Sequence, residues 1–467
     1  MLEKSLCISE DKCMYFIIFF EYGKIGMLLV EKDMKIGVIS LGCAKNLVDT
    51  ENLLGMLNAS GQDITTNYEE AEAIIVNTCG FIESAKTEAI ETILNVADLK
   101  QQGLKKLIVM GCLAQRYKSD LEKEMPEVDL FISIDEYTNL GEILSKELGE
   151  RIINNYGKAP RMLSDKPWMA YLRIADGCDN RCSYCAIPLI RGNLRSFKEE
   201  NLVEEATRLI QMGVKELTLI AQDSSRYGFD WDRKLHLSSL IKKLDAIDGV
   251  KWIRILYLYP DEIPDDLIDT MKNAKHVLPY FDIPIQHGSD RMLKLMHRRS
   301  NAAEILERSI KIRKELPNAV LRTTVMAGFP GETLEDHKQN LDLMKAVKWD
   351  HLGAFTYSKE EGTPSYNMVD DVPQEEKERR KKEIMMLQDE IVKEAREALV
   401  GQEAEVLIEG YEPLTNMYLG RSVLFAPDGV DGVVRVKSNS KLEIGSFYQT
   451  KYTRVSGQNM IAEVIGE

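Results

Sequence analysis

Short apolar runs alternate with helical patterns along most of the chain. From Met34 to about Tyr156, runs of strand length are separated by stretches in which apolar residues recur at helical intervals, which is typical of a parallel α/β sheet. Amphipathic helices are predicted at residues 46–57 and 81–99. The predicted strands span residues 35–42, 72–78, 106–111 and 129–134.

A second series of strands begins after a linker at residues 158–167, which contains two prolines. Each predicted strand is followed by helical or turn-rich sequence, and the repeat of about 30 to 45 residues favours a partial (β/α)6 barrel over an eight-stranded one. The carboxyl ends of these strands would form the active face. The strands are predicted at residues 169–176, 216–222, 252–258, 280–286, 320–328 and 351–357.

The hydrophobic pattern changes twice in the last fifth of the chain, from residue 374 onward. Residues 374–399 predict a covering helix with Ile384, Leu387, Ile391 and Ala395 on its apolar side, and the basic run at 377–382 is interpreted as a solvated face. After Gly401 the pattern has period two, which predicts a small antiparallel β-barrel. The fold class is therefore α/β. Its predicted parts are an open parallel α/β sheet domain (34–157), a partial barrel with its covering helix (168–400) and a closing β-barrel (401–467).

Residues 1–33 stand outside this pattern, because Met34 opens a clean first strand. The apolar run at 13–20 is too short to span a bilayer, and the acidic residues before it do not suit a signal peptide. We interpret residues 1–33 as an upstream extension or a floppy tail, in which Cys7 and Cys13 carry no chemistry.

Length, net charge and the number of cysteines limit the possible classes of function. The chain has 467 residues and a formal net charge of -15, so two or three domains are expected, and any nucleic-acid role would need a local basic patch. Eight cysteines at this length are too few for a secreted disulfide scaffold. Thiolate ligands in a reducing cytoplasm are the better interpretation.

The strongest local motif is ADGCDNRCSYCAIP, which places Cys178, Cys182 and Cys185 on one loop after a predicted strand. Three such thiolates can hold three irons of a 4Fe-4S cluster and leave the fourth iron open to a ligand. The alternative is a structural zinc loop, but zinc sites normally close with a fourth Cys or His at a second short spacing.

A second set of cysteines is dispersed in sequence. Cys43, Cys79 and Cys112 each follow a predicted strand of the N-terminal sheet, and each has a glycine beside it. Because the carboxyl ends of parallel strands share one edge, these three residues are expected to meet there and hold a second cluster. Three buried core cysteines are the alternative.

The triple-cysteine spacing, with Tyr184 just before the last cysteine, resembles the radical S-adenosylmethionine (SAM) superfamily. The resemblance implies that SAM binds the open iron and is split to a 5′-deoxyadenosyl radical, with Tyr184 against the adenine; an ordinary loop aromatic is the alternative. From Met34 onward, the chain resembles the methylthiotransferases, which combine a three-cysteine domain, a radical SAM barrel and a TRAM-type barrel. Their reaction replaces C–H by C–S–CH3 and uses two 4Fe-4S clusters and two SAM molecules.

Further SAM contacts are expected at strand ends. VMAGFPGET supplies Gly328, Gly331 and Glu332, where backbone can approach a ligand closely. Gln222 and Asp223 could bind the SAM amino group and Arg322 its carboxylate, with structural ion pairs as the alternative for each. Arg191 and Arg195 could contact substrate or simply cap neighbouring elements.

The motif SLGCAKNLVDTE resembles the ribosomal-protein branch of the family (RimO-like). That branch modifies the β-carbon of an aspartate in the twelfth protein of the small ribosomal subunit. The segment 401–467 has more acidic than basic residues, which suits a basic protein partner better than transfer RNA. An electron donor and a sulfur source are implied, and no membrane. Two other hypotheses remain: a transfer-RNA adenosine methylthiotransferase, and a non-catalytic iron–sulfur carrier.

Overall fold

The computed structural model describes residues 2–9, 12–21, 24–31 and 34–466, and for residues before 34 it describes only the backbone. The chain divides into two compact units, residues 1–162 and 163–467, which are described separately.

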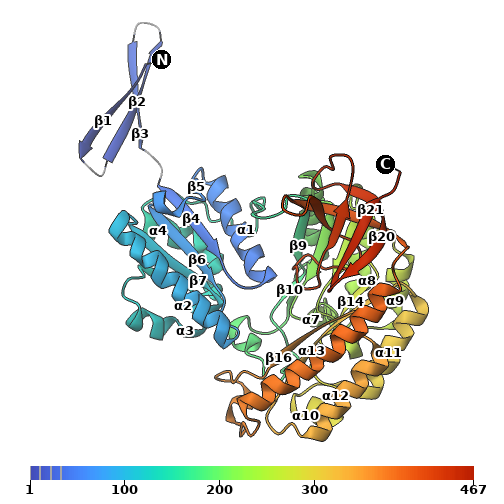
Figure 1. Ribbon diagram of the computed structural model, residues 1–467. Helices are drawn as coiled ribbons and strands as arrows, with labels where there is room; N and C mark the ends of the chain where they lie inside the picture. Colours follow the sequence, from blue (N-terminus) through green and yellow to red (C-terminus); the bar gives the residue numbers. More distant parts are fainter. Residues whose placement is uncertain (1, 10–11, 22–23, 32–33, 467) are drawn as a thin grey trace. The chain divides into compact units, whose positions relative to one another are not determined.

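The first unit contains a five-stranded parallel sheet (Figure 1). Its strands lie in the order β5-β4-β6-β7-β8. The chain adds β5 on one side of β4 and then β6 on the other side, so the strand order reverses between β4 and β6. The four predicted strands are confirmed, and the short edge strand β5 was not predicted. The strands are β4 (Lys35–Ser40), β5 (Asp63–Thr65), β6 (Ala73–Thr78), β7 (Lys106–Gly111) and β8 (Leu130–Ile132).

Helices cover both faces of this sheet, which is why the strands read as continuous apolar runs. One core joins the sheet to α1 (Ala44–Ala59) and α4 (Leu140–Leu148), and the other joins it to α2 (Glu83–Ala97) and α3 (Cys112–Glu124). In such doubly wound sheets, ligands bind at the carboxyl edge where the strand order reverses.

The second unit contains six parallel strands in chain order. Two three-stranded sheets, β9-β12-β13 and β14-β15-β16, adjoin where the Leu258 amide donates to the Asp282 carbonyl at 2.8 Å. The partial barrel is therefore confirmed. Its strands are β9 (Met169–Arg173), β12 (Glu216–Ile220), β13 (Trp252–Ile255), β14 (Tyr280–Asp282), β15 (Val320–Ala327) and β16 (His351–Thr356).

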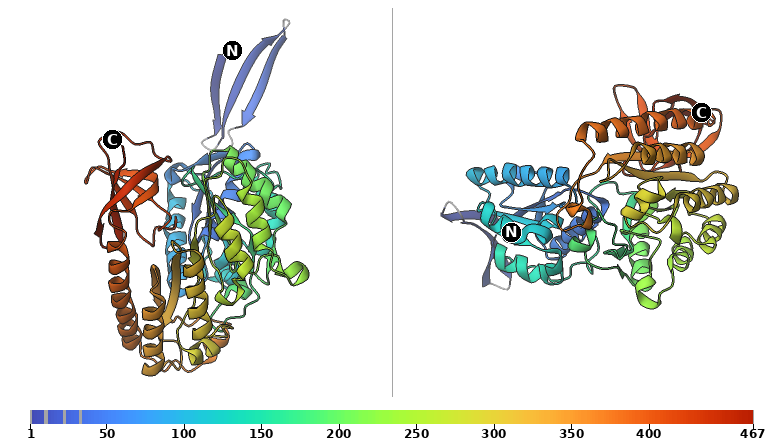
Figure 2. Two further views of the ribbon diagram at one scale, coloured as in Figure 1. Left: turned by 90° about the vertical axis from the view of Figure 1, so that its right-hand side faces the viewer. Right: turned by 90° about the horizontal axis from the view of Figure 1, so that it is seen from below.

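Helices line the outside of these strands (Figure 2). A two-stranded ribbon, β10 (Ala175–Asp176) with β11 (Arg195–Ser196), brackets the cysteine loop. The helices are α5 (Ile187–Ile190), α6 (Glu199–Gln211), α7 (Phe229–Asp232), α8 (Leu237–Asp245), α9 (Asp265–Asn273), α10 (Asp290–Leu295), α11 (Ala302–Glu315), α12 (Leu334–Val347) and α13 (Gln374–Glu397).

The covering helix α13 packs on β15 and β16, but its buried side is not the purely apolar one expected. Ile384 and Ile391 are buried, as predicted. Two residues of the basic run, Lys377 and Arg380, are also buried, so the interpretation of 377–382 as a solvated face was wrong for these two. Each has a carboxylate partner: Lys377 Nζ lies 2.7 Å from Asp370, and Arg380 Nε lies 2.7 Å from Glu376.

A closed five-stranded barrel follows α13. Four of its strand pairs are antiparallel, as predicted, but β19 and β21 are parallel and close the barrel. A local period-two pattern indicates a strand but not the direction of its partner. The strands are β17 (Glu403–Glu412), β18 (Met417–Arg421), β19 (Val434–Lys437), β20 (Phe447–Ser456) and β21 (Asn459–Val464).

This closed barrel is fixed to the amino ends of the parallel strands by buried ion pairs. Glu216, at the start of β12, accepts from Arg421 of β18 at 2.6 Å and from Arg254 of β13 at 3.0 Å. Tyr280 donates to Asp431, and the aromatic rings of Trp252 and Phe447 stack edge to face. The closed barrel therefore occupies the end of the parallel strands opposite to their carboxyl face.

Residues before Met34 contain three antiparallel strands that pair with one another: β1 (Leu2–Ser9), β2 (Lys12–Glu21) and β3 (Lys24–Glu31). The side chains of Cys7 and Cys13 lie outside the described residues. Whether this segment is an upstream extension stays a prediction.

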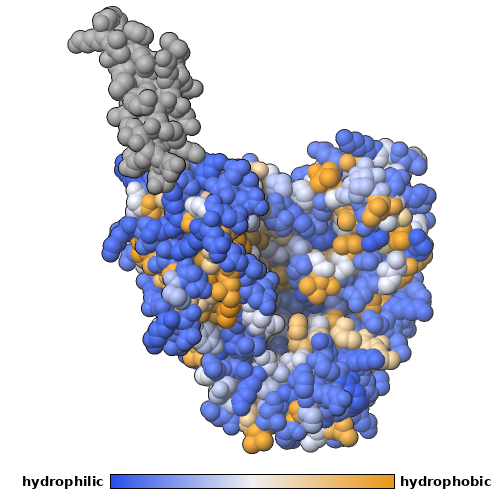
Figure 3. Space-filling view, turned by 60° about the vertical axis from the view of Figure 1, so that its left-hand side comes forward, coloured by the Kyte–Doolittle hydropathy of each residue, from blue (hydrophilic) through white to orange (hydrophobic). Residues whose placement is uncertain are grey.

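Hydrophilic side chains cover most of the face drawn in Figure 3, in keeping with a chain in which 29% of residues are charged. Within the described parts of the chain, none of the helices combines the length and apolar character that crossing a bilayer requires.

Candidate active site

The three N-terminal cysteines lie at the carboxyl edge of the parallel sheet, beside the strand-order reversal. Cys43 precedes α1, Cys79 directly follows β6, and Cys112 is the first residue of α3. Cys43 is exposed, whereas Cys79 and Cys112 are buried. Amides at the amino ends of α1 and α3 favour negative charge on the neighbouring sulfurs, as thiolate ligands require.

Glycines allow the three cysteine loops to touch. A Cβ on Gly42 would lie 2.6 Å from the Cβ of Cys79, and a Cβ on Gly80 would lie 2.9 Å from the backbone of Leu113, next to Cys112. Gly42 also has a φ of +89°, a conformation that strains other residues. The glycines beside Cys43 and Cys79 therefore allow close packing between the loops.

One asparagine ties these loops together. Asn46 Nδ2 donates to the Leu41 carbonyl at 3.0 Å and to the Thr78 carbonyl at 2.9 Å. Its Oδ1 accepts from Cys112 Sγ at 3.4 Å. Asn46 thus forms hydrogen bonds with the segments that carry all three cysteines. These bonds hold the three cysteine loops together.

The second set of cysteines lies on the loop between β10 and α5, at the carboxyl face of the barrel. Gly177 opens the loop with a φ of +71°, and a Cβ there would lie 2.0 Å from the Asn193 carbonyl oxygen. The Cys178 amide donates to the Gly192 carbonyl at 3.1 Å and the Cys185 amide to that of Cys182 at 3.1 Å. The loop is therefore folded back on itself with its three thiols on one short segment.

The cysteines of the barrel loop suit a metal-bound state. Burial raises the pKa of Cys178 and of Cys185 to about 12, so their thiolate forms need a bound metal to be stable. Across residues 34–466, no three His, Cys, Asp or Glu side chains converge closely enough to share one metal ion. A cluster needs no such convergence, because each cysteine binds a different iron.

Three of the predicted SAM-binding residues lie beside this loop. Tyr184 packs edge to face on Phe329, with ring centroids 6.5 Å apart. Asp223 accepts from Asn180 Nδ2 at 2.6 Å, and Asn180 sits between Cys178 and Cys182. Gln222 Nε2 donates to Asp176 at 3.3 Å, while its buried Oε1 has no hydrogen-bond partner among the described residues.

The turn at residues 328–332 also lies at the carboxyl face, but its contacts are within the turn and with neighbouring segments such as α13. A Cβ on Gly328 would lie 2.1 Å from Lys377 Cγ, so packing against α13 requires this glycine. Glu332 accepts from the Gly328 amide and lies 3.4 Å from Arg380 Nη1. Burial disfavours its charge, yet contacts with His287, His337 and Arg380 lower the pKa of Glu332 to about 2. Gly331 is less crowded, since a Cβ there would meet only Arg291, at 4.0 Å.

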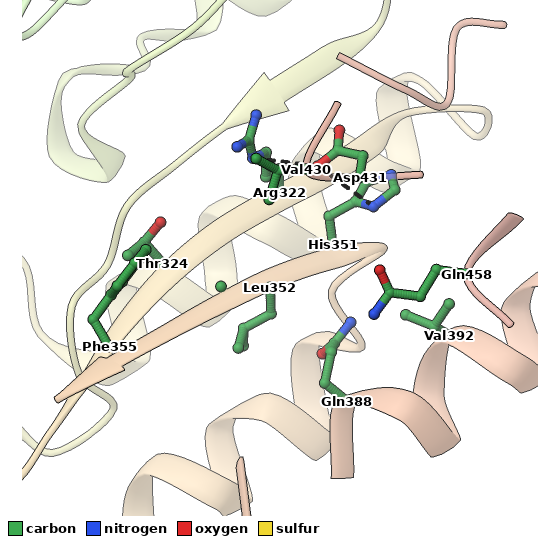
Figure 4. Close-up of a pocket in the computed structure, with 11 residues that line it drawn as sticks. Arg322, Thr324, His351, Leu352, Phe355, Gln388, Val392, Val430, Asp431 and Gln458 are labelled. Carbon is green, nitrogen blue, oxygen red and sulfur yellow. Dashed lines mark ion pairs between the residues drawn. The ribbon is translucent and has the colours of Figure 1, made fainter. Parts of the chain in front are cut away.

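Arg322 is not brought to the cysteine loop. It is the third residue of β15, near the amino end, and Gly328 follows that strand six residues later, roughly 20 Å away. Its guanidinium lies 2.7 Å from Asp428, 3.4 Å from Asp431 and 3.9 Å from Asp282. Figure 4 shows it lining a pocket with His351 and Asp431. These contacts agree with the alternative prediction for Arg322, which was a structural ion pair.

The two arginines after the loop have different surroundings. Arg191 lies 3.2 Å from Asp176 with its side chain buried, so it supports the base of the loop. Arg195 is exposed and packs over the Phe197 ring at 5.9 Å.

Sequence reasoning missed three residues that contact cysteines. Asn46 carried a usable signal, because it follows Cys43 by three positions and so lies on the same helix face. Tyr259 and Arg298 approach Cys182 from distant segments, with Tyr259 Oη 2.9 Å and Arg298 Nη1 3.8 Å from its sulfur. No local pattern marks either residue.

Three known families match successive parts of the chain. Residues 35–133 match the uncharacterized protein family UPF0004, residues 172–344 the radical SAM superfamily and residues 400–465 the TRAM domain. The ribosomal protein uS12 methylthiotransferase RimO of Clostridioides difficile (strain 630) is 45% identical over 444 residues, which cover 93% of this chain and 99% of the relative. The protein of that name from Aquifex aeolicus is 46% identical over 428 residues, with 91% and 96% covered.

The chain belongs to the RimO methylthiotransferase family. The resemblance found in the sequence is confirmed, and the RimO-family chain is a radical SAM enzyme of the methylthiotransferase class. Membership of the radical SAM superfamily implies a 4Fe-4S cluster and SAM as cofactors.

Solved structures agree with the fold of this RimO-family chain. The radical SAM methyltransferase TsrM from Kitasatospora setae, solved with tryptophan and a SAM analogue, superposes with a TM-score of 0.53 at 10% identity, covering 69% of this chain and 73% of that one. The cobalamin-dependent radical SAM enzyme OxsB gives a TM-score of 0.50 at 12% identity, covering 81% and 64%. At these identities the likeness concerns the fold alone.

Proposed function

We propose that this protein inserts a methylthio group at the β-carbon of an aspartate in ribosomal protein uS12. The observation that carries the proposal is the coverage of nearly the whole length of RimO relatives at about 45% identity, with both cysteine sets at carboxyl strand edges. The substrate is taken from the printed names of those relatives, and the branch motif SLGCAKNLVDTE supports it.

The proposed reaction uses two 4Fe-4S clusters and two SAM molecules. When bound, the cluster at Cys178, Cys182 and Cys185 would supply the electron that splits SAM into a hydrogen-abstracting radical, and that at Cys43, Cys79 and Cys112 a site for the inserted sulfur. One SAM molecule would give the radical and the other the methyl group.

The residues around the barrel loop would then bind and orient SAM. Tyr184 offers a ring beside the loop for the adenine, and Gln222 has a buried acceptor without a partner among the described residues, suited to an ammonium group. Asp223 and the turn at 328–332 would complete the site. Arg322 is left out, because its three carboxylate partners lie near the other end of β15.

The proposal includes a reducing electron donor and a sulfur source as partners. A cytoplasmic location belongs to it as well, because thiolate ligands and open iron sites require reducing conditions.

Iron and acid-labile sulfide, measured on anaerobically reconstituted protein, test the two-cluster proposal. About eight irons per chain are expected, falling to about four when Cys178, Cys182 and Cys185 are replaced by alanine, with loss of SAM cleavage. The matched variant that replaces Cys43, Cys79 and Cys112 should also hold about four irons but still cleave SAM. If the wild type holds about four irons and the first variant none, sulfur insertion at the N-terminal cysteines is wrong.

The substrate is tested by incubating the reconstituted enzyme with uS12 and, separately, with transfer RNA, followed by mass spectrometry. A methylthio group on the uS12 aspartate is expected. Modification of RNA alone would overturn the substrate, and cluster absorbance without any SAM cleavage would indicate an iron–sulfur carrier.

A further inference from the structure

Two polar groups surround the sulfur of Cys182, the middle cysteine of the barrel loop. Tyr259 Oη lies 2.9 Å from Cys182 Sγ, and Arg298 Nη1 lies 3.8 Å from it. Cys178, by contrast, is near the carboxylates of Asp223 and Asp179. A positive charge and a hydroxyl donor thus meet at one of the three ligands.

Arg298 is held firmly in this position. Its guanidinium stacks on the Tyr259 ring at 3.9 Å, and its Nη2 donates to the Pro284 carbonyl at 2.6 Å. The residue is only 9% exposed, so solvent and salt screen its charge weakly. An arginine cannot lose its proton in a protein, so the charge is permanent.

The backbone supports the same arrangement. Tyr259 N donates to Ser225 Oγ at 3.0 Å, and Arg298 N donates to the Leu293 carbonyl at 2.8 Å. The nearby Tyr257 and His297 have φ values of +63° and +56°, which non-glycine residues adopt rarely. Strained backbone of this kind persists where the surroundings fix it, and it is frequent at functional sites.

We propose that Arg298 and Tyr259 are positioning residues that raise the reduction potential of the cluster held by Cys178, Cys182 and Cys185. This inference rests on the proposed function, since it requires a cluster at that loop. Reduction adds one negative charge to the cluster. A guanidinium and a phenol O–H directed at a ligand sulfur stabilise that charge more than the oxidised state, so the electron enters more easily.

The test is a redox titration followed by electron paramagnetic resonance. It uses the full chain with Cys43, Cys79 and Cys112 replaced by alanine, so that only the barrel cluster reports. Arg298→Gln and Tyr259→Phe should each make reduction at least tenfold less favourable, a fall of about 59 mV for a one-electron couple. Arg298→Lys should recover most of the loss, because it restores the charge.

A second readout separates electron supply from SAM binding. With a weak reductant, SAM cleavage should fall in the order of the measured potentials, and a stronger reductant should restore it. A purely structural role for Arg298 would instead reduce the iron content and leave the potential of the remaining cluster unchanged.

Arg299→Gln is the matched control. Arg299 also lies near the Tyr259 ring, at 5.6 Å, but its charge is paired with Asp261 at 2.7 Å and Glu262 at 3.0 Å. Its replacement should leave the potential unchanged.

An unchanged potential in cluster-loaded Arg298→Gln would overturn the inference, and so would an equal shift in Arg299→Gln. If Arg298→Gln holds no iron, Tyr259→Phe decides, because it removes a single oxygen. Absence of any reducible cluster in the wild type would contradict the proposed function instead.

Discussion

Gly42 shows how a single residue controls the N-terminal cysteine site. Its backbone has a φ of +89°, and a Cβ would lie 2.6 Å from the Cβ of Cys79. We expect Gly42→Ala to displace Cys79 and to lower the iron bound at this site well below that of the wild type. The measurement is iron per chain after anaerobic reconstitution of a protein that lacks the barrel cysteines.

Gly61→Ala is the control for backbone strain. Gly61 has a similar φ of +78°, but nothing lies within 4 Å of its Cβ position. Both variants should lose roughly 1–2 kcal/mol of stability from the left-handed backbone. Only Gly42→Ala should lose iron, and equal iron loss in the two would show that the contact with Cys79 is unimportant.

At the residue scale, the cysteines could be predicted from the sequence better than the residues that contact them. The cysteines were identifiable because spacing and strand ends limit where thiolates can meet. Tyr259 and Arg298 were not, since each contacts a cysteine only after distant segments pack together. Arg322 shows the opposite case: the sequence left a SAM contact and a structural ion pair open, and only the folded chain supplies Asp282, Asp428 and Asp431 as its partners.

At the scale of elements, apolar runs located all the long parallel strands. The apolar pattern did not predict β5, which has only three residues and a largely polar sequence, Asp-Ile-Thr. On α13 it missed the buried polar side, because hydrophobic periodicity counts only apolar residues. Gln388 and Arg396 are buried there, with partners on the Trp349 carbonyl and on His351.

Buried ion pairs join the closed barrel to the parallel strands, and Arg421 is central among them. It lies 2.6 Å from Glu216, which is 0% exposed, and 2.8 Å from Glu409. Arg421→Met leaves buried carboxylates short of a partner, so we expect a loss of about 3–5 kcal/mol in the free energy of unfolding. Urea denaturation measures this loss.

Lys437→Met provides the comparison for that variant. Lys437 pairs with Glu463 at 3.4 Å, and the two side chains are 62% and 53% exposed. Exposed pairs contribute about 0–1 kcal/mol, so this variant should unfold almost as the wild type does. Equal effects of the two substitutions would mean that the buried pairs do not secure the closed barrel.

His351, at the same junction, predicts a pH dependence of stability. Burial and, more weakly, the charge of Arg396 lower the pKa of His351 to about 4, against the opposing effect of Asp431. The unfolded chain binds this proton at a pKa of about 6.5, so stability is lost as the pH falls below that value. Between about pH 7.5 and about pH 5 the loss attributable to His351 should be about 2 kcal/mol.

His351→Gln removes the titrating group and should flatten that part of the stability curve. The comparison is between urea midpoints of the two proteins across the same pH range, because carboxylates contribute equally to both. Parallel curves would show that His351 does not titrate between its folded and unfolded values.

At the scale of the whole molecule, the fold changes the meaning of the charges in the closed barrel. The count over residues 401–467 favours acidic residues, but several of these charges are used in contacts with the parallel-strand barrel. Arg421 contacts Glu216, Asp428 contacts Arg322 and Asp431 contacts Tyr280. Glu409 contacts Trp168, just before β9. Among the described residues of this segment, the other exposed charges are balanced: Glu403, Glu405, Glu443 and Glu463 against Lys437, Lys441, Lys451 and Arg454. Attraction of a basic protein must therefore come from the whole chain, whose formal charge is -15.

This overall charge makes the proposed substrate testable by ionic strength. A negatively charged enzyme attracts a basic ribosomal protein over long distances, and salt screens that attraction beyond about 10 Å at 0.1 M. We expect kcat/KM for uS12 to fall several-fold between about 50 mM and about 300 mM salt, mainly through slower association. SAM cleavage without a protein substrate is the control and should change little, because it needs no encounter between macromolecules. A kcat/KM that is constant or rises with salt would mean that contacts at the binding site, rather than the field of the chain, bring the substrate in.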